Sequence, residues 1–215
     1  MREADPIAIH LDHGSSTDAC AAAIAAGFTS VMIDGSHLPL NENIALAQKV
    51  VALAKPQNIS VEGEVGQLQK LNPDGSMPEV KNLSDPADVA RMSRESGIDM
   101  LAVGIGNAHG FYKETPNIRF DLLEQLAGAS TIPLVLHGST GLSDETIARC
   151  VSMGMAKVNL GTLLRTRWVE YTAQVIAENN HQNHPWRVGQ SVKEKLKPHI
   201  RHILQCAGSA RRAAM

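Results

Sequence analysis

The stretch Ile132-Pro-Leu-Val-Leu-His-Gly-Ser-Thr-Gly-Leu-Ser-Asp-Glu145 decides the fold class. It opens with a short apolar run over residues 132–136, which is typical of a strand buried on both faces. A glycine-containing turn follows at residues 137–141. Ser143-Asp-Glu145 then supplies the cap and the acidic first turn of a helix that ends near Gly154. Strand, turn and helix in this order make up one βα unit.

The same order recurs on both sides of this stretch. Further strand-like runs lie at residues 7–11, 29–33, 59–61, 100–105 and 157–160, and further helix signals lie at 19–26, 41–54 and 84–96. Repeated βα units predict an α/β fold, either a doubly wound parallel sheet or a (β/α)8 barrel. We expect a single domain over residues 1–215, with C-terminal helices from about residue 163, at 166–179 and 192–204.

Composition and charge exclude several classes of protein. Twenty Lys and Arg against 22 Asp and Glu leave no basic surplus for nucleic acid, and 3% aromatic residues are too few for a base-stacking surface. The longest apolar-rich stretch, residues 19–28, is shorter than the roughly 20 residues of a membrane helix. The first six residues lack the pattern of a secretory signal, and the three cysteines form no CxxC pair. We therefore expect a soluble, cytoplasmic protein without nucleic-acid or membrane partners.

Three histidines follow strand-like runs, and each stands directly before a glycine: His13, His109 and His137. In a parallel barrel the carboxyl ends of all strands lie on one face, so these side chains are expected to meet. Three imidazoles can hold a divalent cation and leave a fourth position open, as in a catalytic zinc site. The alternative, three unrelated polar residues at strand ends, is disfavoured by the shared His-Gly pattern.

Carboxylates repeat this pattern at Asp12, Asp34, Glu62 and Glu64. Residues 62 and 64 share one face of a strand and can both point into the barrel mouth. A carboxylate buried there must be paired or bind a cation. Asp12 and His13 would point to opposite faces of a regular strand, so we expect the strand to end or twist at this point.

Two turns, at residues 137–141 and 159–162, offer small residues and backbone N–H groups. Phosphate binding by the loops after the last two barrel strands is a recurrent device. Residues 66–83 form a loop long enough to be either functional or disordered. Lys113 is either a phosphate contact or a surface lysine.

With these residues identified, the sequence resembles the class II, metal-dependent ketose-bisphosphate aldolases, in particular the tagatose-/fructose-1,6-bisphosphate branch. The likeness runs nearly from end to end and includes the tail at residues 187–211. The segments that carry it are His10-Leu-Asp-His13, Ser30-Val-Met-Ile-Asp-Gly-Ser36, Val61-Glu-Gly-Glu-Val-Gly66, Leu101-Ala-Val-Gly-Ile-Gly-Asn-Ala-His-Gly110, Pro133-Leu-Val-Leu-His-Gly138 and Lys157-Val-Asn159.

The resemblance implies a (β/α)8 TIM barrel that cleaves a ketose 1,6-bisphosphate into dihydroxyacetone phosphate and glyceraldehyde 3-phosphate. It implies that His13, His109 and His137 hold one catalytic Zn²⁺ and that Asp12 is the proton-transfer acid/base. Asp34 and Glu64 match a possible second divalent metal site. The positions that match substrate contacts are Gly110, Gly138, Ser139, Thr140, Asn159, Leu160, Gly161 and Thr162.

The chain departs from the family's pattern in two ways. It shows only six strand-like runs, so we expect an N-terminally incomplete barrel of about six βα units. Strand number and closure are linked, so the edge strands would be exposed. We therefore expect a homo-oligomer or aggregate, with weak or absent aldolase activity unless upstream sequence is restored. The second departure from the family's pattern is in a loop. Gln67-Leu-Gln-Lys70 stands where the family's loop supplies part of the proton-transfer machinery.

Two other readings compete with an active aldolase. The first is a truncated homologue that binds metal but is catalytically impaired. The second is a metal-dependent amidohydrolase, which needs a His-x-His pair and a late aspartate. The chain has His10-Leu-Asp-His13 and Asn159 at these places, which disfavours the second reading.

Overall fold

The computed structural model describes residues 7–68, 70–77, 83–114, 116–178, 184–210 and 212. Within them, six parallel strands form one sheet in the order β1-β2-β3-β4-β5-β6. The strands are β1 His10–Gly14, β2 Ser30–Ile33, β3 Ser60–Val65, β4 Met100–Val103, β5 Leu134–Leu136 and β6 Met155–Val158. A doubly wound sheet reverses its strand order at a switch point, and this sheet does not, so the barrel-type alternative is the one observed.

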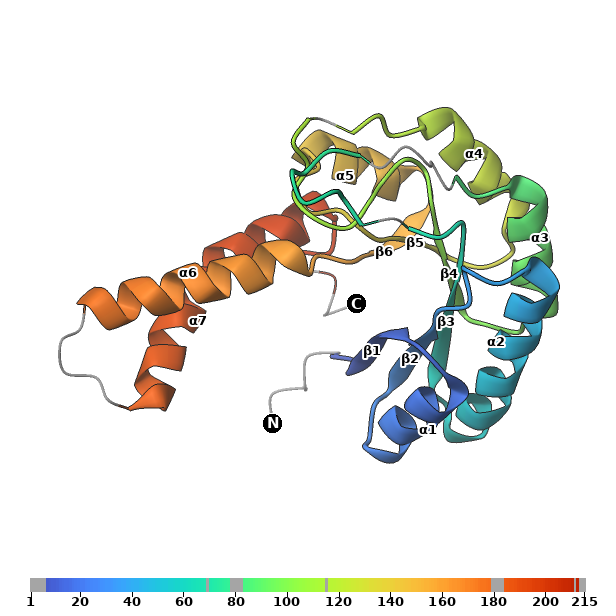
Figure 1. Ribbon diagram of the computed structural model, residues 1–215, viewed down its shortest axis with the longest axis horizontal. Helices are drawn as coiled ribbons and strands as arrows, with labels where there is room; N and C mark the ends of the chain where they lie inside the picture. Colours follow the sequence, from blue (N-terminus) through green and yellow to red (C-terminus); the bar gives the residue numbers. More distant parts are fainter. Residues whose placement is uncertain are drawn as a thin grey trace.

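The sheet curls, and α1–α5 cover its outer side (Figure 1). These helices are α1 Thr17–Ala25, α2 Leu40–Ala54, α3 Pro86–Glu95, α4 Phe120–Ala129 and α5 Asp144–Ser152, and a short 3-10 helix η1, Lys55–Gln57, continues α2. Among the described strands, β1 and β6 are the edges and do not pair with each other. The expected (β/α)8 barrel is therefore present as a curled half-barrel of six βα units.

Alternation along the strands explains why both faces of the sheet are apolar. Val31 and Ile33 belong to the large core that packs against the outer helices. Met32, between them, forms a separate inner cluster with Ala102 and Val135. Successive side chains of a strand point to opposite faces, so an unbroken apolar run supplies both cores.

Most helix starts agree with their sequence signals. Ser16 and Ser143 cap α1 and α5, since their side chains accept hydrogen bonds from Ala19 N and Thr146 N. The sequence analysis missed α4, whose N-cap residue Arg119 makes no side-chain capping bond. The expected strand at residues 7–11 was also wrong in its bounds. β1 begins only at His10, and Ile7 and Ile9 are exposed.

The C-terminal helices α6 Thr162–Glu178 and α7 Pro185–Cys206 form a hairpin that projects from the half-barrel (Figure 1). Val175, Val192 and Leu196 give the hairpin a small core of its own. Parts of the expected loop at 66–83 (residues 69 and 78–82), residues 179–183 and residue 211 lie outside the described residues. None of the helices in the described ranges has the length and apolar character needed to cross a membrane.

Candidate functional site

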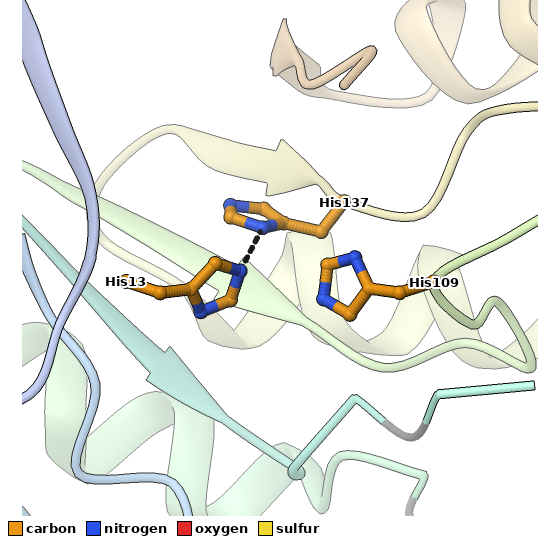
Figure 2. A group of neighbouring side chains, drawn as sticks. All are labelled: His13, His109 and His137. Atoms are coloured by element: carbon orange, nitrogen blue, oxygen red, sulfur yellow. Dashed lines mark hydrogen bonds between the residues drawn. The ribbon is translucent and has the colours of Figure 1, made fainter. Parts of the chain in front are cut away.

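Three histidine rings converge at the carboxyl ends of the strands (Figure 2). His13 lies in β1, His109 follows β4 and His137 directly follows β5. The ring centroid of His13 lies 5.0 Å from that of His109 and 4.9 Å from that of His137, and the centroids of His109 and His137 are 6.0 Å apart. One ring nitrogen of each residue lies within 4.8 Å of the others, so the predicted convergence is observed.

The backbone of β1 turns at His13, as the sequence required. His13 has a φ of +49°, in the left-handed region, and the pairing of β1 with β2 shifts register between Leu11 and Gly14. This turn lets the neighbours Asp12 and His13 line the same cavity. A non-glycine residue in this region costs on the order of 1–3 kcal/mol, so its surroundings must hold it in place.

Two carboxylates set the protonation of the facing imidazoles. His13 Nδ1 lies 2.8 Å from Asp34 Oδ2, and His137 Nε2 lies 2.7 Å from Glu62 Oε1. Since a carboxylate only accepts, these nitrogens carry the protons. When both rings are neutral, the remaining nitrogens, His13 Nε2 and His137 Nδ1, face each other across 3.1 Å with a lone pair each. Only a proton or a cation between them makes this arrangement favourable.

The spacing of these nitrogens fits a metal ion. Two nitrogens bound to a tetrahedral zinc at about 2.0–2.1 Å lie about 3.3 Å apart, close to the observed distance. Burial and repulsion from His13 and His137 lower the pKa of His109 to about 4, so this imidazole is neutral, as a ligand must be. The hydrogen bond to Asp34 raises the pKa of His13, so metal binding there would displace a proton.

Asp34, Glu64 and His13 form a second group whose ligand atoms lie within 4.8 Å of one another. Burial opposes ionisation of Asp34, but hydrogen bonds from His13 and Ser36 outweigh it and lower its pKa to about 2. Glu64 is buried, and burial together with the charge of Asp34 raises its pKa to about 7. Its Oε2 has no hydrogen-bond partner among the described residues, which leaves it available to a proton or a cation.

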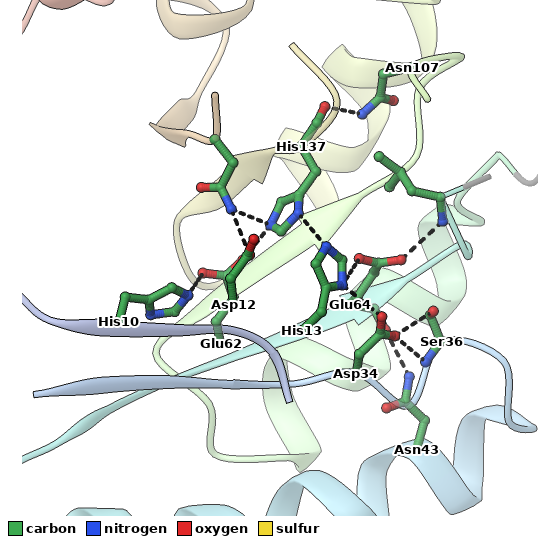
Figure 3. A network of polar contacts seen from close by, with 12 residues as sticks. His10, Asp12, His13, Asp34, Ser36, Asn43, Glu62, Glu64, Asn107 and His137 are labelled. Atoms are coloured by element: carbon green, nitrogen blue, oxygen red, sulfur yellow. Dashed lines mark hydrogen bonds and ion pairs between the residues drawn. The ribbon is translucent and has the colours of Figure 1, made fainter. Parts of the chain in front are cut away.

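Glu62 anchors His137 from below the site (Figure 3). Its side chain is fully buried, and Oε2 lies 2.7 Å from Lys157 Nζ and 3.5 Å from His10 Nε2. Burial opposes ionisation of Glu62, but His137 and Lys157 outweigh it and lower the pKa. The sequence analysis assigned no role to Lys157, although a lone cation in a strand-like run is a signal that could have singled it out.

A cavity of about 440 Å³ opens above the histidines. Most of the expected substrate contacts line it: Gly110, Gly138, Thr140, Asn159, Gly161 and Thr162. Ser139 and Leu160 do not. Ser139 is buried and donates a hydrogen bond to Asn159 O over 2.6 Å, so it ties the two loops together. Gly138 has a φ of +62°, and a Cβ there would lie 2.3 Å from Ala108 O, so this position requires glycine.

The same cavity is lined by two cations to which the sequence analysis gave no role, Lys70 and Arg165. Neither forms an ion pair with a described carboxylate. Lys70 lies in the loop after β3 and Arg165 in the first turn of α6, and how these segments approach the cavity depends on the tertiary structure, so no local signal marks the two residues. Lys113 instead lies outside this cavity, in an exposed ion pair with Asp74 over 3.6 Å.

A family model described as class-II fructose-bisphosphate aldolase matches residues 1–212. The chain belongs to this family. It is 39% identical over 208 residues to a 6-phospho-5-dehydro-2-deoxy-D-gluconate aldolase of Bacillus licheniformis, a match that covers 97% of this chain and 70% of that protein. It is 38% identical to a probable fructose-bisphosphate aldolase of Bacillus subtilis, with 97% and 73% covered.

Solved structures of class II aldolases show the same fold. The YdjI aldolase of Escherichia coli K12 superposes with a TM-score of 0.82 at 31% identity, over 99% of this chain and 73% of that one. A putative fructose-1,6-bisphosphate aldolase of Coccidioides immitis gives 0.82 at 27% identity, over 98% and 74%. The chain therefore spans about three quarters of the length of these aldolases, and aldol chemistry is the activity of the family.

Proposed function

We propose that the chain catalyses the metal-dependent aldol cleavage of a ketose 1,6-bisphosphate, tagatose or fructose, to dihydroxyacetone phosphate and glyceraldehyde 3-phosphate. The observation that carries this proposal is the placement of Asp12 beside the three histidines in one cavity. A zinc ion held by His13, His109 and His137 would supply Lewis-acid stabilisation of the charge that develops on the ketone oxygen when the C3–C4 bond breaks.

Asp12 is the proposed base. It is exposed to the cavity, and its Oδ1 accepts a hydrogen bond from Asn159 Nδ2 over 3.1 Å. Cleavage begins when a base removes the proton of the C4 hydroxyl, and a carboxylate at this place can take that proton. In this proposal Asn159 orients the carboxylate of Asp12 through Oδ1, and Asp12 Oδ2 stays available to the substrate.

The phosphate next to the ketone is proposed to bind at the start of α6. Thr162 is the first residue of that helix, and the backbone N–H groups and dipole of a helix N-terminus favour an anion. Gly138 and Thr140 face the same cavity from the loop after β5. Arg165, in the first turn of α6, adds positive charge there and forms no ion pair with a carboxylate of the described residues.

A second substrate follows from the names of the relatives. The name 6-phospho-5-dehydro-2-deoxy-D-gluconate places a ketone beside a phosphorylated carbon, as in a ketose 1,6-bisphosphate, but with a carboxylate in place of the second phosphate. Both compounds share the half that would become dihydroxyacetone phosphate. Lys70, which also lines the cavity, would suit either anion at the other end.

One assay separates these substrates. Purified zinc-loaded protein is given fructose 1,6-bisphosphate, tagatose 1,6-bisphosphate or 6-phospho-5-dehydro-2-deoxy-D-gluconate, and dihydroxyacetone phosphate is followed with a coupled reductase. Chelator-sensitive release of dihydroxyacetone phosphate from one of the bisphosphates supports the proposal. Release from the gluconate derivative alone shows that this compound, and not a ketose bisphosphate, is the substrate. No release from any of them, at full zinc content, favours the impaired homologue.

We further propose a second divalent cation at Asp34 and Glu64, and a homo-oligomer formed through the edges β1 and β6. The second metal site is supported by Glu64 Oε2, which has no hydrogen-bond partner among the described residues and lies 4.0 Å from His13 Nδ1. The oligomer is supported by the exposed Ile7 and Ile9 beside β1. We place the protein in the cytoplasm, in keeping with its three free cysteines.

A further inference from the structure

We propose that Asp144, His202 and Cys206 form a separate zinc site that fastens the end of α7 to α5. Asp144 is the first residue of α5, and His202 and Cys206 lie in the last turns of α7. Their ligand atoms all lie within 4.8 Å of one another. None of the three lines the cavity of the proposed active site, so this site is independent of the aldolase chemistry.

The spacing in α7 is that of a chelating pair. Residues four apart on a helix are neighbours on one face, so His202 and Cys206 present nitrogen and sulfur to the same point. His202 Nε2 lies 3.6 Å from Cys206 Sγ. Nitrogen and sulfur bound to one tetrahedral zinc, at about 2.0 and 2.3 Å, lie about 3.5 Å apart, so this edge of the site is already formed.

Asp144 completes the set from the other helix. Its Oδ2 lies 2.9 Å from His202 Nε2. The corresponding edge of a tetrahedral zinc site is about 3.4 Å, so a shift of about half an ångström admits the ion. Both partners are exposed, so the side chains are free to make this adjustment.

The donor set selects zinc. One imidazole, one thiolate and one carboxylate are ligands that zinc accepts together, whereas Mg²⁺ and Ca²⁺ need a shell of oxygen atoms. Three protein ligands leave one position for water. An ion pair between Asp144 and His202 alone would add little stability at an exposed site, and it would not call for a cysteine one turn further along.

The other cysteines behave differently. Cys20 and Cys150 are fully buried in the main core, where they pack as small apolar side chains. Cys206 alone among the three lies beside an imidazole and a carboxylate. The site also has a structural task, because the α6–α7 hairpin projects from the half-barrel (Figure 1) and α7 contacts α5.

The test uses the full chain with the His109→Ala and His137→Ala substitutions, which remove the proposed catalytic site. Under reducing conditions this protein is expected to keep the zinc ion of the Asp144 site, and Co²⁺ in its place should give a thiolate-to-metal charge-transfer band. Cys206→Ser should abolish the band. His202→Ala should lower the binding constant by about tenfold or more, since losing even an outer partner of a metal ligand commonly has that effect.

The matched control is His184→Ala, which removes an exposed histidine at the start of α7 and should leave both the band and the affinity unchanged. If the double variant does not fold, the same comparison is made in the parent chain, where Cys206→Ser should bind one zinc fewer. A Cys206→Ser protein with undiminished zinc and an unchanged Co²⁺ spectrum would overturn the proposal. So would a folded double variant that binds no zinc.

Discussion

Asn159 Nδ2 donates a hydrogen bond to Asp12 Oδ1 over 3.1 Å, although 147 residues separate them in the sequence. Asp12 lies in β1 and Asn159 directly follows β6, so this bond links the two edge strands of the curled sheet. It also holds the proposed base over the cavity. The proposed base is therefore a different residue from the proposed metal ligands, and this separation of roles can be measured.

Replacing Asp12 by Ala should lower kcat for aldol cleavage by about 10²–10⁴-fold, because it removes a general base. Zinc content should stay at the parent level, since no metal ligand is lost. Steady-state kinetics and elemental analysis measure the two effects, and Asp18→Ala, at an exposed carboxylate of α1, is the control. If Asp12→Ala loses zinc as completely as His13→Ala, the division between base and ligand is wrong.

Replacing His109 and His137 together by Ala should reduce the zinc content by one ion per chain, because two of three converging ligands are lost. Elemental analysis of protein purified without chelator measures this loss. His37→Ala removes an exposed histidine outside the cavity and should keep all of its zinc. Full zinc content in the double variant would falsify the assignment of the metal site.

Replacing Glu62 by Gln should weaken zinc binding in the cavity by about 10–100-fold, the usual effect of losing a carboxylate that orients a metal-bound histidine. The substitution removes the negative charge of Glu62, so its ion pairs with His137 and Lys157 are lost. Competition with a chromophoric chelator gives the affinity. Glu95→Gln, which breaks an exposed pair with Arg91, should bind zinc like the parent, and equal affinities for all three proteins would contradict the role of Glu62.

The metal-free protein should show a pH effect that depends on Glu64. Burial and the charge of Asp34 raise its folded-state pKa from 4.5 to about 7. A raised pKa gives stability that is complete below pH 4.5 and is lost as the pH rises through 7. The glutamine of Glu64→Gln does not titrate. The free energy of unfolding of the variant minus that of the parent should therefore rise by up to roughly 3 kcal/mol between about pH 5 and pH 8.

Thermal or urea unfolding at these two pH values gives the comparison. His109, whose pKa is lowered to about 4, favours the folded state more as the pH rises, but it is present in both proteins and its effect cancels. A difference between variant and parent that is constant or shrinks with rising pH would show that Glu64 is ionised at neutral pH.

The chain should associate through its sheet edges. β1 and β6 present unpaired backbone groups among the described residues, and exposed edges pair with other chains. Light scattering coupled to size exclusion should therefore report a mass above that of one chain. Ile9→Lys places a charge beside β1 and should shift the population toward monomer. A monodisperse monomer for the parent would refute this expectation.

Much of this architecture could be predicted because local signals and tertiary structure agree. Apolar runs marked β2, β4 and β5 closely and overlapped β3 and β6 by only two residues each, and serine or aspartate caps marked α1, α3 and α5. The first strand was displaced, since Ile7 and Ile9 are apolar but find no core. α4 was missed because it starts without a capping side chain.

The candidate site could also be predicted only in part. The meeting of His13, His109 and His137 could be foreseen because every parallel strand ends on the same face. The contacts of Lys157 with Glu62, and the position of Arg165 on the cavity, could not. They depend on how strongly the sheet curls and on where α6 begins, and neither property can be predicted from local sequence signals.

The separate core of the α6–α7 hairpin has a consequence for the motions of the chain. Val175, Val192 and Leu196 bury little apolar surface compared with the main core, so the hairpin can open while the sheet stays intact. Amide protons of α6 should then exchange with solvent earlier than those of β3 and β4. Because α6 begins at Thr162, on the cavity, a ligand anchored there would slow the exchange of a hairpin that mostly lies away from it.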